Sequence, residues 1–363
     1  SMKGKNVLQI TAIGVPVIAT PYVESFLELA AKVTDAGLMR RRPGFYLPRI
    51  LFWSLGMVIT LVAVTLAGDG WYQLLFAVFL GVAMSQLGFL SHEAAHQEIF
   101  EDRRWNEWTS RVLAGMFIGL SYGWWVDKHS RHHANPNKER SDPDVASGVL
   151  ALTPESTDRR TGLAAKIARY QGWYFLPLLP FEGFSLHIAT VRSLLGRSRV
   201  RFRWVEIILV GIRLLGIPLL LLLVLPFWLA VAFILVQTLV FGLLLGGAFA
   251  ASHIGMPTVP HDVKLDFLRR QVYMSRNIRG NRLVHFLMGG LEYQIEHHLF
   301  PRTPRPNLPA LQKMVREHCS ALGIRYTETT LGAAYGVIIS YLNQVGLKNR
   351  DPYTCPLVVQ FRG

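Results

Sequence analysis

Two long apolar runs near the start of the chain set its hydrophobic pattern. Residues 50–67 carry no charged side chain, and neither do residues 71–90. Each run is long enough to cross roughly 30 Å of hydrocarbon as a helix. Only Gly68, Asp69 and Gly70 separate the two runs. The pattern therefore predicts a helical hairpin that spans a membrane.

A second hairpin is predicted further along the chain. Arg213 is the only charged residue in the apolar run 207–252, and Pro226 divides that run near its middle. The run has the length of two spans, and a proline interrupts a helix, so a tight turn at Pro226 is expected. After Ser252 no apolar run is long enough to cross.

Three other apolar stretches predict helices that do not cross. Residues 24–37 place apolar side chains at helical spacing ahead of the arginines at 40–42. This pattern favours an amphipathic helix beside the membrane, with a solvated surface helix as the alternative. The apolar stretch 112–126 is short and favours an interfacial or re-entrant helix. The proline-containing stretch 170–195 suits a segment at the interface.

Together these patterns predict an all-α integral membrane protein with four transmembrane helices in two hairpins, interfacial helices and a cytoplasmic helical cap. The predicted parts are an amphipathic N-terminal segment (1–49), hairpin one (50–90), a cytoplasmic or interfacial region (91–203), hairpin two (204–252) and a cytoplasmic C-terminal region (253–363).

Composition agrees with a membrane protein and adds an orientation. Hydrophobic residues make up 51% of the chain and charged residues 17%, which is too apolar for an ordinary soluble protein. Lys and Arg outnumber Asp and Glu by 38 to 24, a net charge of +14. Such an excess is typical of cytoplasmic loops, so both termini are predicted to be cytoplasmic. The basic residues are scattered and form no nucleic-acid-binding module, so nucleic acid is not a predicted partner.

The candidate chemistry lies in three histidine clusters, each at the predicted cytoplasmic end of an apolar segment. A spacing of three or four residues places side chains on one face of a helix. The clusters are His92-Glu93-Ala94-Ala95-His96, His129-Ser130-Arg131-His132-His133 and Gln294-Ile295-Glu296-His297-His298. The first cluster alone is also similar to the zinc-protease pattern. The three together predict a metal site.

The number and type of these ligands bear on the metal. Seven histidines are more than one tetrahedral zinc ion can use, so two ions are implied. The only cysteines are Cys319 and Cys355, and they do not form a thiolate cluster. Imidazole suits iron, copper, nickel or zinc, and a pair of irons is the form suited to activating dioxygen. Composition leaves the choice between iron and zinc open.

The clusters H-E-A-A-H, H-S-R-H-H and Q-I-E-H-H-L-F-P resemble the histidine boxes of the integral-membrane fatty acid desaturases, and the glutamine of the last box resembles the front-end subgroup. The similarity extends over about residues 40–320. It includes the stretch 133–137 leading to 142–144, the stretch 252–257, and residues 289–291 before the third box.

The resemblance implies a di-iron centre with O₂ as co-substrate and a further ligand from the end of the fourth span. The implied catalytic and metal-binding residues are His92, His96, His129, His132, His133, His253, His297 and His298. Gln294 stands where other branches have a histidine, and whether it binds metal is left open. Some relatives place an asparagine one turn before the extra histidine, where this chain has Phe249.

Other polar and aromatic residues near the boxes are weaker candidates. Carboxylates can accept a hydrogen bond from the outer nitrogen of a metal-bound imidazole. The residues considered for this role are Glu93, Glu296, Asp142 and Asp144. Trp124 and Trp125 are candidates to line the substrate channel, although aromatic pairs are also common at bilayer interfaces. Besides His253, four histidines lie outside the clusters: His285 as a near-site candidate, and His187, His261 and His318 as structural residues.

The sequence thus predicts an oxygen-dependent desaturase that inserts a cis double bond into an acyl chain carried by coenzyme A, a carrier protein or a lipid. No flavin, haem or fused cytochrome b5 motif is recognised, so a separate ferredoxin or cytochrome b5-like donor with its reductase is expected. A hydroxylase on the same scaffold is the nearest alternative. A histidine-rich metal transporter is another, although transport sites normally lie within the spans.

Overall fold

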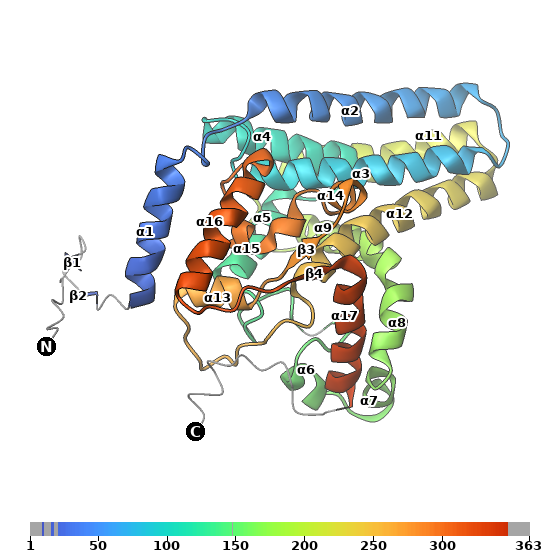
Figure 1. The fold of residues 1–363 in the computed structure, drawn as a ribbon. Helices are drawn as coiled ribbons and strands as arrows, with labels where there is room; N and C mark the ends of the chain where they lie inside the picture. The colour runs from blue at the N-terminus through green and yellow to red at the C-terminus, as the bar shows by residue number, and fades with distance from the viewer. Residues whose placement is uncertain (1–8, 11–15, 18–20, 147, 348–363) are drawn as a thin grey trace, which may run out of the picture.

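The computed structural model describes residues 9–10, 16–17, 21–146 and 148–347, and it is largely helical (Figure 1). The predicted segments 1–49 and 253–363 therefore lie partly outside the described residues. The α-helices are α1 (Pro21–Asp35), α2 (Pro43–Leu66), α3 (Gln73–Ala95), α4 (Arg103–Val112), α5 (Tyr122–Ala134), α6 (Pro154–Asp158), α7 (Gly162–Ala168), α8 (Gln171–Leu178), α9 (Glu182–Leu195), α10 (Arg203–Gly211), α11 (Ile217–Val224), α12 (Phe227–His253), α13 (Phe267–Tyr273), α14 (Arg282–Met288), α15 (Gln294–Leu299), α16 (Leu308–Ala321) and α17 (Leu331–Gly346). The strands are β1 (Gln9–Ile10), β2 (Pro16–Val17), β3 (Asn277–Arg279) and β4 (Glu328–Thr330), paired β1 with β2 and β3 with β4.

Four helices in the described part of the chain are long and apolar enough to cross a membrane: α2, α3, the continuous helix Arg203–Val224 and α12. This confirms the predicted fold class. Two boundaries differ from the apolar runs. Helix α2 begins at Pro43, because proline is well tolerated in the first turn of a helix. Helix α3 continues to Ala95, so the first histidine cluster forms its last turn.

The turns of both hairpins follow from local chemistry. Between α2 and α3, the side chain of Gln73 donates to the carbonyl oxygens of Val64 at 3.0 Å and Gly68 at 2.6 Å. The bond to Val64 satisfies a carbonyl in the last turn of α2, and the bond to Gly68 holds the turn that follows. Between α11 and α12 the chain becomes extended at Leu225, and α12 starts directly after Pro226.

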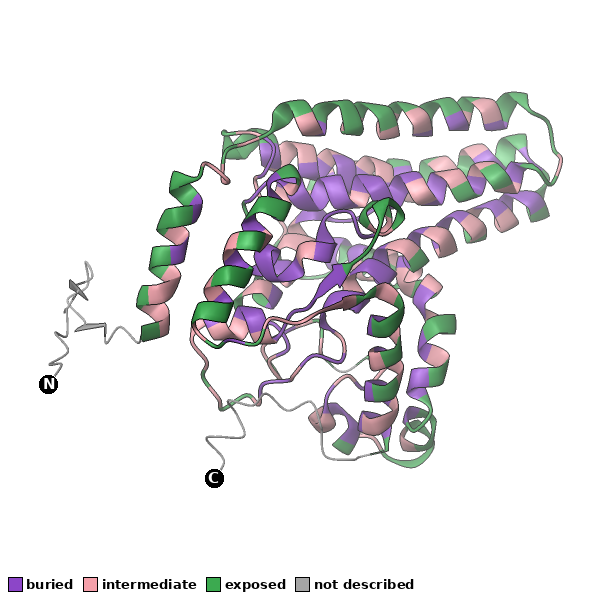
Figure 2. Ribbon diagram, in the orientation of Figure 1, coloured by how far each residue is buried: buried purple, intermediate pink, exposed green. Residues whose placement is uncertain are grey.

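Helices α3 and α12 form the centre of the membrane part. In the most apolar 18-residue part of α3, 61% of the residues are buried within the protein. The corresponding share for α2 is 17%. Much of helix α2 is instead exposed, as its green colour in Figure 2 shows. Leu51, Phe52 and Ile59 are among its exposed residues. A hydrocarbon environment suits these side chains. Gly81 of α3 lies against the backbone of α12, where an added Cβ would be 2.7 Å from the carbonyl oxygen of Gln237.

The two stretches expected at the interface are broken helices. In 112–126, α4 ends at Val112, a π-helical turn follows at Leu113–Ile118, and α5 starts at Tyr122. In 170–195, a 3₁₀ turn at Leu179–Phe181 separates α8 from α9. Neither stretch contains a helix with the length of a span.

A cap of short helices covers the ends of α3 and α12 that carry histidines (Figure 1). The predicted amphipathic helix is present as α1, but Leu29 and Val33 are buried in the core of the cap, not in a membrane surface. The rings of Phe26 and Phe267 lie 4.8 Å apart and join α1 to α13. The parallel pair β3–β4 is a small departure from an all-α cap.

Close packing at Gly242 gives a test of the membrane core. An added Cβ at Gly242 would lie 2.0 Å from the carbonyl oxygen of Pro180, which is backbone and cannot rotate away. We expect Gly242→Ala to destabilise the protein by about 1–3 kcal/mol, seen as a Tm lowered by a few degrees in detergent. Gly211→Ala is the matched control, because nothing lies within 4 Å of its Cβ position. Equal Tm values for the two variants would contradict this packing.

Candidate metal centre

Five of the predicted histidines converge to form one group, which we call group A. Its members are His92, His96, His129, His133 and His297. One ring nitrogen from each lies within 4.8 Å of the others. The Nε2 atom of His129 lies 3.1 Å from that of His92, 2.9 Å from that of His96 and 3.0 Å from that of His133. Helices α3, α5 and α15 thus meet at these imidazoles.

The other three predicted histidines form group B, from α5, α12 and α15. The Nε2 atom of His253 lies 3.3 Å from that of His132 and 3.0 Å from that of His298. The side-chain nitrogen of Gln294 lies 2.8 Å from the same His253 atom. The i, i+3, i+4 triplet of α5 is therefore divided, with His132 in group B and its neighbours in group A.

These nitrogen contacts fit metal ions better than hydrogen bonds. A ring nitrogen carries one proton or one lone pair, so His129 Nε2 cannot bond to three other Nε2 atoms at once. Metal–nitrogen bonds of about 2.0–2.1 Å place adjacent octahedral ligands about 3 Å apart. The Oε1 atom of Gln294 is also buried without a partner, and it would be satisfied by a cation. The donor set therefore fits the two metal ions that the resemblance implies.

On α5 and α15, electrostatics favour the neutral imidazole, the form that binds metal, at four of the five ligand histidines. Burial, and then the charge of neighbouring imidazoles, lowers the pKa of four histidines in the two groups well below the ordinary value: His129, His133, His297 and His298. Burial lowers the pKa of His96 to about 3. A neutral imidazole has a free lone pair, so these residues are ready to act as ligands near neutral pH.

The outer nitrogens of group B are held by hydrogen bonds. His132 Nδ1 lies 2.9 Å from an oxygen of Asp142, and His253 Nδ1 lies 3.0 Å from the carbonyl oxygen of Met274. Burial lowers the pKa of His132, but the bond to Asp142 and the nearby carboxylates raise it, with a net upward shift. These bonds fix the tautomer and direct Nε2 toward the group. In group A, by contrast, His133 Nδ1 is buried without a partner.

Two of the four carboxylates considered as imidazole acceptors face other partners. Glu93 forms an ion pair with Arg305, with two contacts of 2.6 Å. Glu296 accepts from Asn277 at 2.6 Å and from Tyr326 at 2.8 Å. Their positions beside histidines in sequence suggested the acceptor role, but both carboxylates bond to these other partners and neither has a hydrogen bond to a histidine of group A or group B. That interpretation is therefore wrong for both residues.

Asp142 and Asp144 lie where the sequence suggested. Asp142 accepts from the backbone N–H of Asn137 at 2.8 Å and of Asp144 at 2.9 Å, which holds its carboxylate toward His132. Asp144 lies 3.3 Å from His132 Nδ1 and forms an ion pair of 2.5 Å with Lys128. The buried Asp142 and the more exposed Asp144 therefore both support the second box.

Sequence reasoning missed two amides that support the boxes. Gln271 Oε1 lies 2.9 Å from His298 Nδ1, while its Nε2 donates to the carbonyl of His133 at 2.9 Å. Asn277 accepts from the backbone N–H of Ile295 at 2.9 Å and so anchors α15 to β3. Neither residue lies in a box, and nothing in the spacing distinguishes it from other polar residues of the cap.

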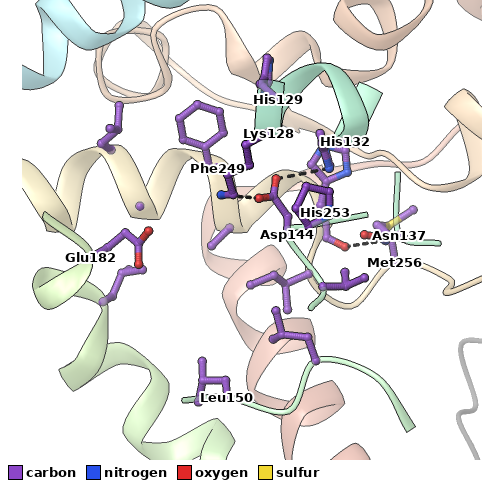
Figure 3. A pocket seen from close by; sticks show the side chains of 18 of the residues that line it. Lys128, His129, His132, Asn137, Asp144, Leu150, Glu182, Phe249, His253 and Met256 are labelled. Atoms are coloured by element: carbon purple, nitrogen blue, oxygen red, sulfur yellow. Dashed lines mark hydrogen bonds and ion pairs between the residues drawn. The ribbon is translucent and has the colours of Figure 1, made fainter. Parts of the chain in front are cut away.

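A cavity of about 320 Å³ reaches both groups, lined by His129 of group A and by His132 and His253 of group B. Figure 3 shows Lys128 and Asp144 meeting in its wall, with Glu182 on the other side. Apolar residues continue the wall, among them Leu120, Trp125, Leu186, Leu245 and Phe249. The ring of Trp125 stacks on His129, with centroids 4.3 Å apart. Trp124 is not among the lining residues.

The histidines outside the boxes take other positions. His187 contacts the carbonyl of Ile118 at 2.9 Å, and His318 contacts the hydroxyl of Ser25 at 2.8 Å. His261 is exposed. The near-site candidate His285 pairs with Glu292 at 2.8 Å and does not join either group.

Comparisons with known proteins agree with this geometry. Residues 69–330 match the family model described as fatty acid desaturase. The chain is 31% identical over 84% of its length to the Delta(6)-fatty-acid desaturase fat-3 of Caenorhabditis elegans, and it covers 71% of that protein. It is also 31% identical to the Delta(5) fatty acid desaturase fat-4 of the same organism, covering 84% of this chain and 69% of fat-4.

A third relative is the acyl-lipid (9-3)-desaturase of Physcomitrium patens, 28% identical over 89% of this chain and 63% of the moss protein. The chain thus spans about two thirds of the length of these relatives. The family match covers α3, the second membrane hairpin and all three histidine boxes, and the resemblance inferred from the boxes is confirmed. The chain belongs to the fatty acid desaturase family, a family of oxidoreductases that act on acyl chains.

Proposed function

We propose that the protein is an oxygen-dependent desaturase that uses two iron ions to insert a cis double bond into an acyl chain. The observation that carries this proposal is the cavity, because its wall includes ligand histidines of both groups and many apolar side chains, with the charged residues Lys128, Asp144 and Glu182 also in the wall. An acyl chain in the cavity would pass both groups. If the cavity holds a flexible acyl chain in a single conformation, it also determines which methylene groups lie beside the metal.

Different residues would bind the metal ions and exclude water from them. Group A and group B would each hold one iron, and Gln294 would complete group B if its amide is turned so that the oxygen faces His253, an exchange that coordinates rarely distinguish. Bound iron and O₂ would supply the oxidising power to remove two hydrogens from neighbouring methylenes. The ring of Phe249 and the indole of Trp125 exclude water beside the imidazoles.

The reaction also requires electrons. Forming one alkene and two waters from O₂ consumes two hydrogens of the substrate, two electrons and two protons. A ferredoxin or cytochrome b5-like protein with its reductase would deliver the electrons at the basic face. The net charge of +14 suits an acidic donor. The same charge supports termini and boxes on the cytoplasmic side of a multi-pass membrane protein.

Removal of a ligand tests the proposed function directly. We expect His133→Ala to lower product formation by at least about 100-fold and to lower bound iron, because second-shell losses alone cost about 10–100-fold. The measurement is fatty acid profiling of a host that expresses the chain with a redox partner, with iron analysis of the purified protein. The control is His261→Ala, an exposed histidine outside both groups.

Two results would count against the proposal. One is retention of acyl oxidation by His133→Ala at the level of the control. The other is a hydroxylated chain with no alkene from the wild-type protein, which would make the enzyme a hydroxylase on this scaffold.

The contact between Asp142 and His132 Nδ1 gives a second prediction. Asp142→Asn removes the charge that faces His132 Nδ1 while keeping the size of the side chain. We expect about a 10–100-fold loss of activity or of iron affinity, because the outer partner orients the imidazole and raises its basicity. Asp158→Asn, at an exposed position of α6, is the control. Activity within twofold of the control would show that Asp142 does not act through His132.

A further inference from the structure

Glu93 of the first histidine box forms an ion pair with Arg305, in the segment that follows the third box. The Nε and Nη2 atoms of Arg305 donate to separate oxygens of Glu93, both at 2.6 Å. The Glu93 side chain is 5% exposed and that of Arg305 19%. A two-point contact of this kind fixes the orientation of the partners as well as their distance. It therefore sets how the end of α3 lies against the segment that follows α15.

A third segment is joined to the same pair. The backbone N–H of Arg305 donates to the hydroxyl oxygen of Tyr46 at 2.9 Å, and this hydroxyl donates to Glu98 at 2.7 Å. Tyr46 lies in the first turn of α2 and is fully buried. The start of the first membrane helix, the end of the second and the chain beyond the third box thus meet at Arg305.

Group A is assembled across this junction. His92 and His96 come from α3 and His297 from α15, with ring centroids 4.8 Å and 4.6 Å from His297. Hydrogen bonds on the outer nitrogens orient all three histidines of group B. In group A, His133 lacks such a bond. The placement of α3 relative to α15 therefore has a larger part in forming group A than group B.

Stability alone is a poor reason for a buried ion pair at this place. Desolvation of two charges can cost as much as their attraction returns, and apolar replacements are often neutral or stabilising. The best-attested use of such a pair is to fix a register between elements. Here the register is the one that brings His92 and His96 to His297.

We propose that Arg305 is a positioning residue for group A, which it acts on by holding Glu93 of the first box against the chain that follows the third. This proposal rests on the proposed function, since it assigns one metal ion to each group. Neither Arg305 nor Glu93 lines the cavity. Substrate binding should therefore be little affected by their loss, whereas occupancy of group A should be strongly affected.

The test is iron analysis, Mössbauer spectroscopy and steady-state kinetics of the full-length protein carrying Arg305→Met. We expect bound iron to fall from two to about one per chain. The Mössbauer signal of the group A iron should be lost and that of the group B iron retained. Iron affinity at the lost site should fall about 10–100-fold, as for other positioning residues. The value of kcat should fall with KM little changed. Arg305→Lys, which keeps the charge without the two-point contact, should lie between Arg305→Met and the wild type.

Two further variants separate positioning from general destabilisation. Glu93→Gln combined with Arg305→Met should lose no more iron than Arg305→Met alone, because both changes break one interaction. Arg269→Met is the matched control: Arg269 is also 19% exposed and pairs with a carboxylate, Asp266, but within the first turn of α13. It should keep both irons.

Equal loss of both irons in Arg305→Met and Arg305→Lys, or full iron and kcat in Arg305→Met, would overturn the positioning role. A wild-type protein without iron would instead overturn the proposed function itself. If Arg305→Met does not fold, the comparison of Arg305→Lys with Arg269→Met decides the question by the same two measurements.

Discussion

Eight imidazoles held with their ring nitrogens facing one another are the constraint on which the structure depends. His129 Nε2 alone has three other Nε2 atoms within 3.1 Å. Neutral imidazoles cannot form a hydrogen bond at each of these contacts, and protonated imidazoles would repel one another. Metal cations bound between the ring nitrogens would account for the short distances. Burial adds to the constraint, because it lowers the pKa of His129 and His133 and keeps their lone pairs free.

The rest of the fold delivers these imidazoles to one place. Helices α3 and α12 are central in the membrane part, and each ends in a ligand, His92 and His253. Close contacts at Gly81 and Gly242 let the helices and their neighbours approach at backbone distance. The cap supplies α15 and anchors it through Asn277 and Gln271. Group B is thereby oriented by hydrogen bonds, and group A by the meeting of helices at Glu93 and Arg305.

Much of this could be predicted from the sequence because the signals are local. Long apolar runs identify the four membrane helices, and i, i+4 histidines or an i, i+4 glutamine and histidine identify the boxes. The division into two groups was not predictable, because it depends on how α5 is rotated against α3 and α12, which places His132 apart from its neighbours. The role of Glu93 was missed for the same reason. Its partner Arg305 is distant in sequence, and only the packed fold brings the two charges together.

The central claim is that two irons occupy two separate histidine groups. Its most direct test is a crystal structure of the iron-loaded protein with anomalous diffraction recorded at the iron absorption edge. We predict two peaks, one among the Nε2 atoms of group A and one among those of group B beside Gln294. A single peak shared by both groups, or peaks outside them, would contradict the claim.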